Sequence, residues 1–510
     1  MPRGRRLLFV AFGVLLLLRA ALAGVHAGRV GTLTRDAAHY ALAARSVAAG
    51  RPADLVVWHY LGPPPAVGRP LGDYWPAGWP YLLGSALRLC GSSLPSIALV
   101  CAGLSLLLPF ATYAAGRALG ASPARAWLAG VLCAALGPLQ RTGATPESVL
   151  PYQLLSLGVL ALAGGAWRAP RPPAPCLVLA GAAGGAGYAL RGEGWLLAAV
   201  AVGLAAFPRS PSNGRERRRR VLLTAFGAVA VLALLVGRDV AVFGAPAPRP
   251  RRLALWACEA GDLYAYASDP SPAEWWASGP GVRALGAVGD CARGWVDFLP
   301  WPLAALAFWE LVAARGRRRG LAAFPPTLFL GASWLVPALF APAVANPARL
   351  ALNTAPILCL LAAARLGALR SGSGGRLRPA LGGLGLGAGL LAACCWAWPL
   401  SAALPQDPRW LGDSLGPPVC FQAGGRPPLV PGDRVLTSNP WQAAFELGTP
   451  AVQVPVDGAR ALEAVVLRYR PRYFLVLPDR TLHYLDQVRF PWRVVQCTRQ
   501  GTWLQILSPR

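Results

Sequence analysis

An aspartate at position 36 stands about one helical turn before a histidine and a tyrosine, in the sequence TRDAAHY of residues 34–40. On a helix, His39 and Tyr40 are the i+3 and i+4 neighbours of Asp36, so the three side chains share one face. A carboxylate in such a setting can accept a proton as a general base. The alternative is that Asp36 caps the N-terminus of a helix, a common role of aspartate.

Five more charged residues lie in or beside apolar segments: Glu147, Arg191, Glu193, Asp239 and Arg349. Arginine matches phosphate geometry in a bidentate way, so Arg191 and Arg349 are candidates for binding a phosphate group. Each of them can instead snorkel from the end of a membrane span. Glu147 and Glu193 can instead be acids at helix N-termini. Asp239 is costly in lipid, so we expect it to face the same cavity or a pairing arginine.

A polar stretch at residues 244–295 is rich in aromatic residues and acids, among them Trp256 and Tyr264. Aromatic faces and carboxylates together suit stacking on sugar rings and recognition of hydroxyl groups. An aromatic belt at a membrane interface is the alternative explanation. A divalent metal bound by Asp36, His39 and a glutamate is a further alternative, although no Cys-x-x-Cys pair indicates a zinc or redox centre.

The composition predicts that these residues are positioned by membrane-spanning helices. The chain has 510 residues, of which 55% are hydrophobic and only 14% are charged. A soluble protein carries about a quarter charged residues. Apolar stretches of roughly 18 to 22 residues recur, and such stretches can cross a hydrocarbon core about 30 Å thick. The fold class predicted is therefore an α-helical polytopic membrane protein.

The charge distribution predicts how the spans are oriented. All 49 basic residues are arginines, and many cluster in short loops, which marks those loops as cytoplasmic. Most of the acids fall on the other side of the predicted membrane. The net charge of +27 follows these loops, so no nucleic-acid partner is expected. About eleven spans result, with the N-terminus inside and the C-terminus outside.

The predicted topology brings Asp36, Glu147, Glu193 and Arg349 to one outer, water-facing rim. It depends on the number of spans before each residue. Merging residues 176–190 with 194–207, or adding a span at residues 81–89, would reverse everything downstream.

Two outer loops are predicted between the spans. The first span, about residues 7–23, is interpreted as an uncleaved anchor, although a cleaved signal peptide is the alternative. The first outer loop, about residues 25–93, is expected to hold two interfacial helices, at 36–49 and 81–89. The second is the aromatic stretch at 244–295, and the last span is expected at about 379–399.

The C-terminal part has a different pattern. Residues 1–400 are predicted to form the transmembrane domain, and residues 401–510 a small α/β domain in the outer compartment. The apolar and polar pattern there predicts three short strands, two helices and a closing hairpin, at residues 435–437, 451–455 and 473–477, at 441–447 and 459–469, and at 494–507. Four outer cysteines allow Cys258–Cys291 and Cys420–Cys497 bridges in an oxidising compartment.

Several short segments resemble motifs of the GT-C membrane glycosyltransferases, and they occur in the same order. Asp36 with Tyr40 and the helix end ARSVAAG (residues 44–50) resembles the first outer loop of that family. The similar segments further on are PAGWPYLL at 76–83, Glu147, ALRGEG at 189–194, and NPAR at 346–349 with Pro356. The most similar branch contains protein mannosyltransferases and lipid A aminoarabinose transferases.

This resemblance implies an enzyme that takes a sugar from a polyprenyl-phosphate donor. It implies that Asp36 deprotonates an acceptor hydroxyl, which attacks the anomeric carbon with inversion. It also implies that Arg349 and Arg191 stabilise the leaving phosphate. His39, Tyr40, Glu147, Glu193, Asp239, Trp256 and Tyr264 are the substrate-binding candidates. The expected location is a bacterial inner membrane, with the active site and C-terminal domain in the periplasm; the acceptor is a lipid, glycan or protein.

The sequence departs from the family at two positions. Ala37 replaces the second acid of an Asp-Glu pair, and Leu350 follows Arg349 in place of a tyrosine. A catalytically inactive scaffold is therefore one alternative to the transferase. A transporter or flippase of lipid-linked glycans is another, but it predicts paired halves and charges at mid-span, neither of which the sequence shows.

Overall fold

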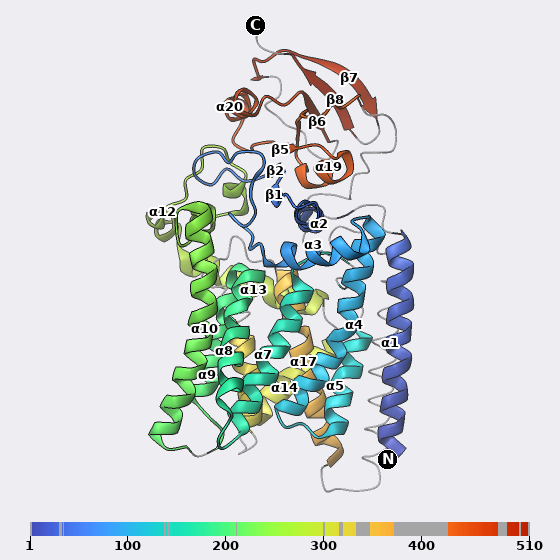
Figure 1. Ribbon diagram of the computed structural model, residues 1–510, viewed down its shortest axis with the longest axis vertical. Coiled ribbons are helices and arrows are strands. Elements are labelled where there is room, and N and C mark those ends of the chain that lie inside the picture. Colours follow the sequence, from blue (N-terminus) through green and yellow to red (C-terminus); the bar gives the residue numbers. More distant parts are fainter. Residues whose placement is uncertain are drawn as a thin grey trace.

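The computed structural model describes residues 3–29, 33, 35–136, 139, 143, 145–210, 212–298, 301–315, 320–332, 347–371, 427–477, 487–498 and 501–507. A bundle of helices forms one end of the molecule and a β-sheet forms the other, with the N-terminus and the C-terminus at opposite ends (Figure 1). Two helices of the first outer loop, α2 and α3, lie between the bundle and the sheet (Figure 1).

The bundle is built from long and shorter apolar helices. Its described helices are α1 (Arg3–Arg29), α4 (Leu94–Ala118), α5 (Pro123–Ala135), α7 (Val149–Arg168), α8 (Ala174–Leu190), α9 (Leu196–Ala206), α10 (Gly214–Phe243), α14 (Trp301–Arg315), α15 (Gly320–Leu330) and α17 (Pro347–Ser371). α1 packs on α4 and α5, and α8 packs on α7, α9 and α10. A 3-10 turn, η1 (Gly192–Trp195), leads from Arg191 into α9, so α8 and α9 are separate helices.

Four described helices contain stretches long and apolar enough to cross a membrane: Leu94–Ala118, Val149–Arg168, Gly214–Phe243 and Leu350–Ala368. Five shorter apolar helices accompany them, at Phe9–Ala21, Pro123–Ala135, Ala174–Leu190, Gly192–Ala206 and Pro302–Ala313. The chain is a membrane protein. The predicted count of eleven spans is not confirmed by these helices, and the last predicted span, at 379–399, lies outside the described residues.

Glycines allow α8 and α10 to approach closely. A Cβ added at Gly181 of α8 would lie 1.9 Å from the carbonyl oxygen of Thr224, and one added at Gly227 of α10 would lie 2.1 Å from that of Val178. Small residues at helix crossings allow backbones to touch in membrane bundles. This contact fixes α8, whose outer end leads into Arg191.

The two interfacial helices predicted in the first outer loop are present as α2 (Arg35–Ala48) and α3 (Gly78–Cys90). Pro80 is compatible with α3 because it stands in the first turn, where a backbone N–H has no partner within the helix. α2 packs on α3 and on α19 (Pro440–Leu447) of the C-terminal part. Between α2 and α3 the loop forms a two-stranded sheet of β1 (Ala53–Asp54) and β3 (Arg69–Pro70).

The C-terminal part has strands and helices where the sequence pattern predicts them. They are β4 (Val435–Thr437), α19, β5 (Ala451–Gln453), α20 (Ala459–Tyr469), β6 (Tyr473–Val476), β7 (Trp492–Thr498) and β8 (Gly501–Ile506). β5, β4 and β6 are parallel, whereas β8 and β7 continue the sheet in antiparallel pairing. The predicted domain boundary near residue 400 lies outside the described residues.

The first outer loop adds a strand to this sheet, which the sequence did not predict. β2 (Val56–Val57) pairs in parallel with β5, so that Val56 lies opposite Ala451 and the strand order is β2-β5-β4-β6-β8-β7. The hydroxyl of Tyr60 donates a hydrogen bond to the carbonyl of Gln453. The C-terminal sheet and the first outer loop therefore form one folded unit above the bundle.

The second outer loop is largely helical. It contains α11 (Arg249–Ala254), η2 (Ala260–Leu263), α12 (Pro272–Ala277) and α13 (Pro280–Phe298). The last of these packs on α17 and so extends the bundle into the region predicted as loop. Cys258 and Cys497 are free thiols, whereas the side chain of Cys291 and the whole of Cys420, their predicted partners, lie outside the described part of the structure.

Candidate functional site

Asp36 stands in the first turn of α2, where a carboxylate is favoured by the helix dipole, and its side chain is half-buried. His39 and Tyr40 follow at the predicted spacing and are both buried. Their ring centroids are 5.5 Å apart, and both rings contact Trp75, at 4.5 Å and 6.1 Å. The start of α2 therefore presents one acid, one imidazole and one phenol to the same region.

The pKa of His39 is lowered, chiefly because burial penalises the imidazolium form. The carboxylates of Asp54 and Asp36 act in the opposite direction but do not outweigh burial. The imidazole is therefore neutral at pH 7, and it can donate or accept a hydrogen bond but does not supply a permanent positive charge.

A serine connects α2 to the end of α8. The Tyr40 hydroxyl donates to Oγ of Ser148 at 3.1 Å, and Nη1 of Arg191 donates to the same oxygen at 3.4 Å. Arg191 also donates from Nε to Oε1 of Glu193 at 2.5 Å, and it lies over the ring of Tyr152, 5.8 Å from its centroid. Tyr40, Arg191 and Glu193 thus meet around Ser148.

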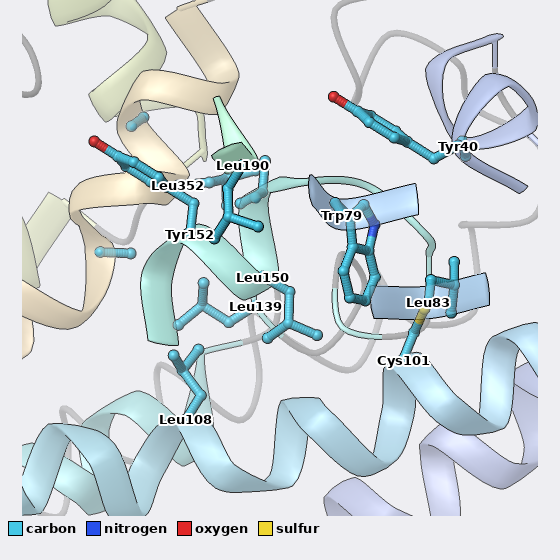
Figure 2. Close-up of a cluster of buried hydrophobic side chains, with 14 of the residues drawn as sticks. Tyr40, Trp79, Leu83, Cys101, Leu108, Leu139, Leu150, Tyr152, Leu190 and Leu352 are labelled. Atoms are coloured by element: carbon cyan, nitrogen blue, oxygen red, sulfur yellow. The ribbon is translucent and has the colours of Figure 1, made fainter. Parts of the chain in front are cut away.

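Glu147 lies directly before Ser148 and is only 2% exposed. The turn that carries both residues is held by α3, because Nε1 of Trp79 donates to the carbonyl of Pro146 at 2.7 Å. Figure 2 shows Trp79 and Leu83 of α3 to the right of Leu150 of α7, and all three belong to one buried core. Glu147 is thus packed at the same level of the molecule as Arg191.

Tyr74 of the first outer loop shows how closely the outer segments converge. Burial raises the pKa of its hydroxyl, and the negative charges of ionised Tyr264, Asp36, Glu193 and Tyr40 raise it further. These four groups come from α2, from the turn after α8 and from the second outer loop. The structure therefore brings Asp36, Glu193 and Tyr264 to one region around Tyr74.

Arg349 stands in the first turn of α17, and its side chain is outside the described part of the structure. The backbone nearby is placed by Gln153 of α7, whose Nε2 donates to the carbonyl of Leu352 at 2.5 Å. Figure 2 shows Leu352 beside Tyr152 and Leu190, which belong to α7 and α8. The first turns of α17, which carry Arg349, therefore pack against α7 close to Gln153.

Asp239 is buried and pairs with arginines, one of the two outcomes expected for it. Its carboxylate accepts from Nη1 of Arg251 and Nη1 of Arg238, both at 2.8 Å. Arg251 also donates to the hydroxyl of Tyr188 at 2.8 Å and to the backbone carbonyl of Tyr74 at 3.2 Å. These bonds hold the first outer loop against α8 and α10, so Asp239 supports the site through Arg251.

The two aromatic candidates of the second outer loop are in different places. The ring of Tyr264 is 6.3 Å from that of Trp58, which also stacks on Trp75 with centroids 4.4 Å apart. The ring of Trp256 instead contacts Trp275 at 6.1 Å, in the second outer loop itself. Tyr264 therefore joins the aromatic group beside His39, whereas Trp256 belongs to a second group.

A buried charged cluster lies inside the first outer loop. Nε of Arg69 is 2.7 Å from Oδ2 of Asp73, and Nη2 of Arg69 is 3.4 Å from Oδ2 of Asp54. His59 lies 3.1 Å from the same Asp73 oxygen. Burial opposes ionisation of Asp73, but Arg69 and then His59 outweigh it, so the pKa of Asp73 is lowered. The cluster stabilises the fold of the loop beside α2.

The described residues contain no group of three or more His, Cys, Asp or Glu side chains that could hold a metal ion. A divalent metal bound by Asp36, His39 and a glutamate is thus without support from the described geometry.

Solved structures of two proteins share this architecture. ArnT from Cupriavidus metallidurans in the apo state has a TM-score of 0.58 at 13% identity, covering 97% of this chain and 98% of that chain. ArnT bound to undecaprenyl phosphate has a TM-score of 0.57 at 14% identity, covering 96% and 97%. The apo oligosaccharyltransferase of Archaeoglobus fulgidus has a TM-score of 0.51 at 12% identity, covering 91% of this chain and 69% of that chain. Both proteins are GT-C glycosyltransferases. This chain has the GT-C fold.

No protein-family model matches the chain, and no curated protein matches its sequence significantly. The predicted resemblance to the GT-C glycosyltransferases is confirmed by the fold alone. The structural match extends over nearly the whole length of ArnT. At 12–14% identity this similarity is one of backbone fold.

Sequence reasoning missed several residues of the site in this GT-C fold. Ser148 and Tyr152 stand beside the predicted Glu147, but nothing in their spacing indicated a contact with Arg191. Trp75 stands within a Pro/Gly-rich stretch, and Trp441 lies in the C-terminal part, where no chemistry was expected. Only the charged cluster of the first outer loop had a signal in the sequence. Its acids Asp54 and Asp73 require partners because charged residues that are buried in a loop close to a membrane must be paired.

Proposed function

We propose that this chain is a membrane glycosyltransferase that moves a sugar from a polyprenyl-phosphate donor to an acceptor hydroxyl. The similarity in fold to ArnT bound to undecaprenyl phosphate supports a donor of this class. Aromatic rings, a half-buried carboxylate and an arginine gather where a lipid-linked sugar would leave the membrane. The observation that carries the proposal is the contact between α2 and the turn after α8: Tyr40 and Arg191 both donate to Oγ of Ser148, and Asp36 stands one helical turn before Tyr40.

The proposed reaction begins with proton transfer from the acceptor hydroxyl to the carboxylate of Asp36. The acceptor oxygen forms a bond to the anomeric carbon, and the bond from that carbon to the phosphate oxygen breaks with its electron pair on the phosphate. Polyprenyl phosphate and a glycoside of inverted configuration result. Arg191, together with Arg349, would stabilise the charge that develops on the phosphate.

We place the site on the periplasmic side of a bacterial inner membrane, with the N-terminus in the cytoplasm. The arginine-rich start of α10, which includes Arg217 and Arg220, supports this orientation under the positive-inside rule. The site lies at the other end of the bundle, under the C-terminal sheet (Figure 1). Thiol labelling of an Asp36→Cys variant in intact cells would locate this position, and exclusively cytosolic reactivity would refute the orientation.

A catalytically inactive scaffold is the second candidate, and one observation favours it. Ala37 replaces the second acid of the family motif and is fully buried, so position 37 serves packing in this chain. Any role of a second acid would then fall to Glu147 or Glu193, both of which lie at the same rim.

Purified protein in lipid nanodiscs, incubated with labelled polyprenyl-phosphate sugars and an extract of envelope acceptors, tests the proposal. The enzyme releases polyprenyl phosphate and forms a glycosylated acceptor, and Asp36→Asn abolishes both without loss of folded protein. Normal turnover by Asp36→Asn would refute its role as base. An absence of transfer with every donor, in a folded protein that retains donor binding, would favour the scaffold.

A further inference from the structure

Ser148 occupies the junction between the predicted base and the predicted phosphate-binding cation, and the proposed mechanism gives it no role. It precedes α7 and is 4% exposed. Serine at the N-terminus of a helix usually caps it by accepting a bond from a backbone N–H. The Ser148 side chain makes no such cap bond, so its hydroxyl is available for other contacts.

Two donors from distant segments share this hydroxyl oxygen. Arg191 can only donate, and its Nη1 reaches Oγ at 3.4 Å. The Tyr40 hydroxyl, from 108 residues earlier in the chain, donates to the same atom at 3.1 Å. A serine hydroxyl has two lone pairs and one hydrogen. With both lone pairs occupied, only the hydrogen remains to be donated.

No described residue accepts that hydrogen in the structure. A buried hydroxyl rarely leaves its donor capacity unused, because an unsatisfied polar group costs free energy. The hydroxyl lies beside Arg191, whose charge is balanced by Glu193 at 2.5 Å. A neutral donor next to a balanced arginine suits an oxygen-rich anion, since it adds a hydrogen bond without adding charge.

We propose that Ser148 donates its hydroxyl hydrogen to a phosphate oxygen of the lipid-linked donor, beside Arg191. This rests on the proposed function, and it adds a substrate-binding residue to that site. Tyr40 and Arg191 orient the hydroxyl by occupying its lone pairs. Because Tyr40 belongs to the helix that carries Asp36, the same oxygen also sets the position of the base relative to the phosphate.

Binding of undecaprenyl phosphate to the full chain in nanodiscs tests the proposal, with undecaprenol as the phosphate-free probe. Ser148→Ala should weaken binding of undecaprenyl phosphate about tenfold or more, as expected for loss of a hydrogen bond to a charged group. It should leave binding of undecaprenol unchanged. Ser148→Thr keeps a hydroxyl and should bind both lipids within about threefold of the parent.

Ser156→Ala is the matched control. Ser156 lies on the same helix and is 1% exposed, but its hydroxyl donates to the carbonyl of Tyr152 and does not contact Arg191. It should not change the preference for the phosphorylated lipid. Equal loss of affinity for both lipids by a folded Ser148→Ala protein would overturn a direct phosphate contact.

The outcomes for this proposal and for the proposed function can be told apart. If the parent transfers sugar but Ser148→Ala keeps the full preference for undecaprenyl phosphate, the role of Ser148 is refuted and the transferase stands. If the parent itself binds undecaprenol as tightly as undecaprenyl phosphate, both proposals are refuted. A rise in the donor KM of Ser148→Ala, with Ser148→Thr restoring it, would support the direct contact.

Discussion

The ring of Trp441 in α19 lies 5.4 Å from the ring of Trp58, the residue that directly follows β2 in the first outer loop. Trp441 is 1% exposed and Trp58 is 2% exposed, so the two rings are part of one core. Phe445, one turn further along α19, lies under the guanidinium of Arg45 in α2, 3.9 Å from ring centroid to Cζ. The C-terminal part therefore supports the helix that carries Asp36.

We expect Trp441→Ala to destabilise the protein and to lower activity, because it removes a large buried ring from between α19 and the first outer loop. Loss of a buried tryptophan typically costs about 3–5 kcal/mol. Thermal unfolding in detergent, followed by tryptophan fluorescence, measures the effect.

Trp276→Ala is the control, since that side chain is 67% exposed and its removal should change the melting temperature little. Equal melting temperatures for the two variants would show that the C-terminal part does not support the loop.

Arg191→Lys should lower kcat by about a hundredfold with little change in stability. The guanidinium uses Nε for Glu193 and Nη1 for Ser148, and a lysine ammonium on a flexible chain cannot hold both partners in that geometry. Steady-state kinetics with a defined donor measure the loss. Arg209→Lys, an exposed arginine at the opposite end of the bundle, is the matched control and should be silent. Full activity of Arg191→Lys would show that only a positive charge is needed there.

The fold was predictable where hydrophobic pattern alone decides structure. The long apolar runs and the alternating strands of the C-terminal part lie where the sequence places them, and so do the two interfacial helices. β2 was not predictable, because Val56 and Val57 form a strand only through pairing with Ala451 and Val452. α13 was missed as well, since it is amphipathic and packs only part of its surface on α17.

The site was predictable where its residues belong to one helix or one turn. Asp36, His39 and Tyr40 share a face of α2 because of their spacing, and Arg191 and Glu193 pair because they are two residues apart. Contacts between elements had no local signal. Neither the hydrogen bonds to Ser148 nor the pairing of Asp239 with Arg251 follows from spacing, because both depend on how α2, α7, α8 and α10 pack.

The buried His59 should make stability depend on pH. Burial and then the Arg69 charge lower its pKa, with Asp73 acting in the opposite direction. As pH falls below the unfolded value of about 6.5, the unfolded chain gains a proton that the folded chain resists, so stability decreases by up to about 1.4 kcal/mol per pH unit. The melting temperature should therefore decrease from pH 7 to pH 5.

The variant His59→Gln should show a shallower decrease of melting temperature over the same pH range, even if it is less stable at pH 7. His39 has a lowered pKa for the same reason and should account for part of the remaining slope. Parallel pH profiles for the parent and His59→Gln would contradict the assignment of a neutral buried imidazole at position 59.

The free thiol of Cys497 links the fold to the proposed orientation. It is exposed on β7, and the hydroxyl of Thr502 is its described hydrogen-bond partner, at 3.8 Å. In intact cells a membrane-impermeant maleimide should therefore label Cys497 without prior reduction, as detected by mass spectrometry of the C-terminal peptide. Cys497→Ser should abolish that signal, whereas Cys359, buried in α17, should stay unlabelled. Labelling that appears only after reduction would show that Cys497 is bridged and would contradict its assignment as a free thiol. Labelling that requires permeabilised cells would place the sheet, and with it Asp36, on the cytoplasmic side.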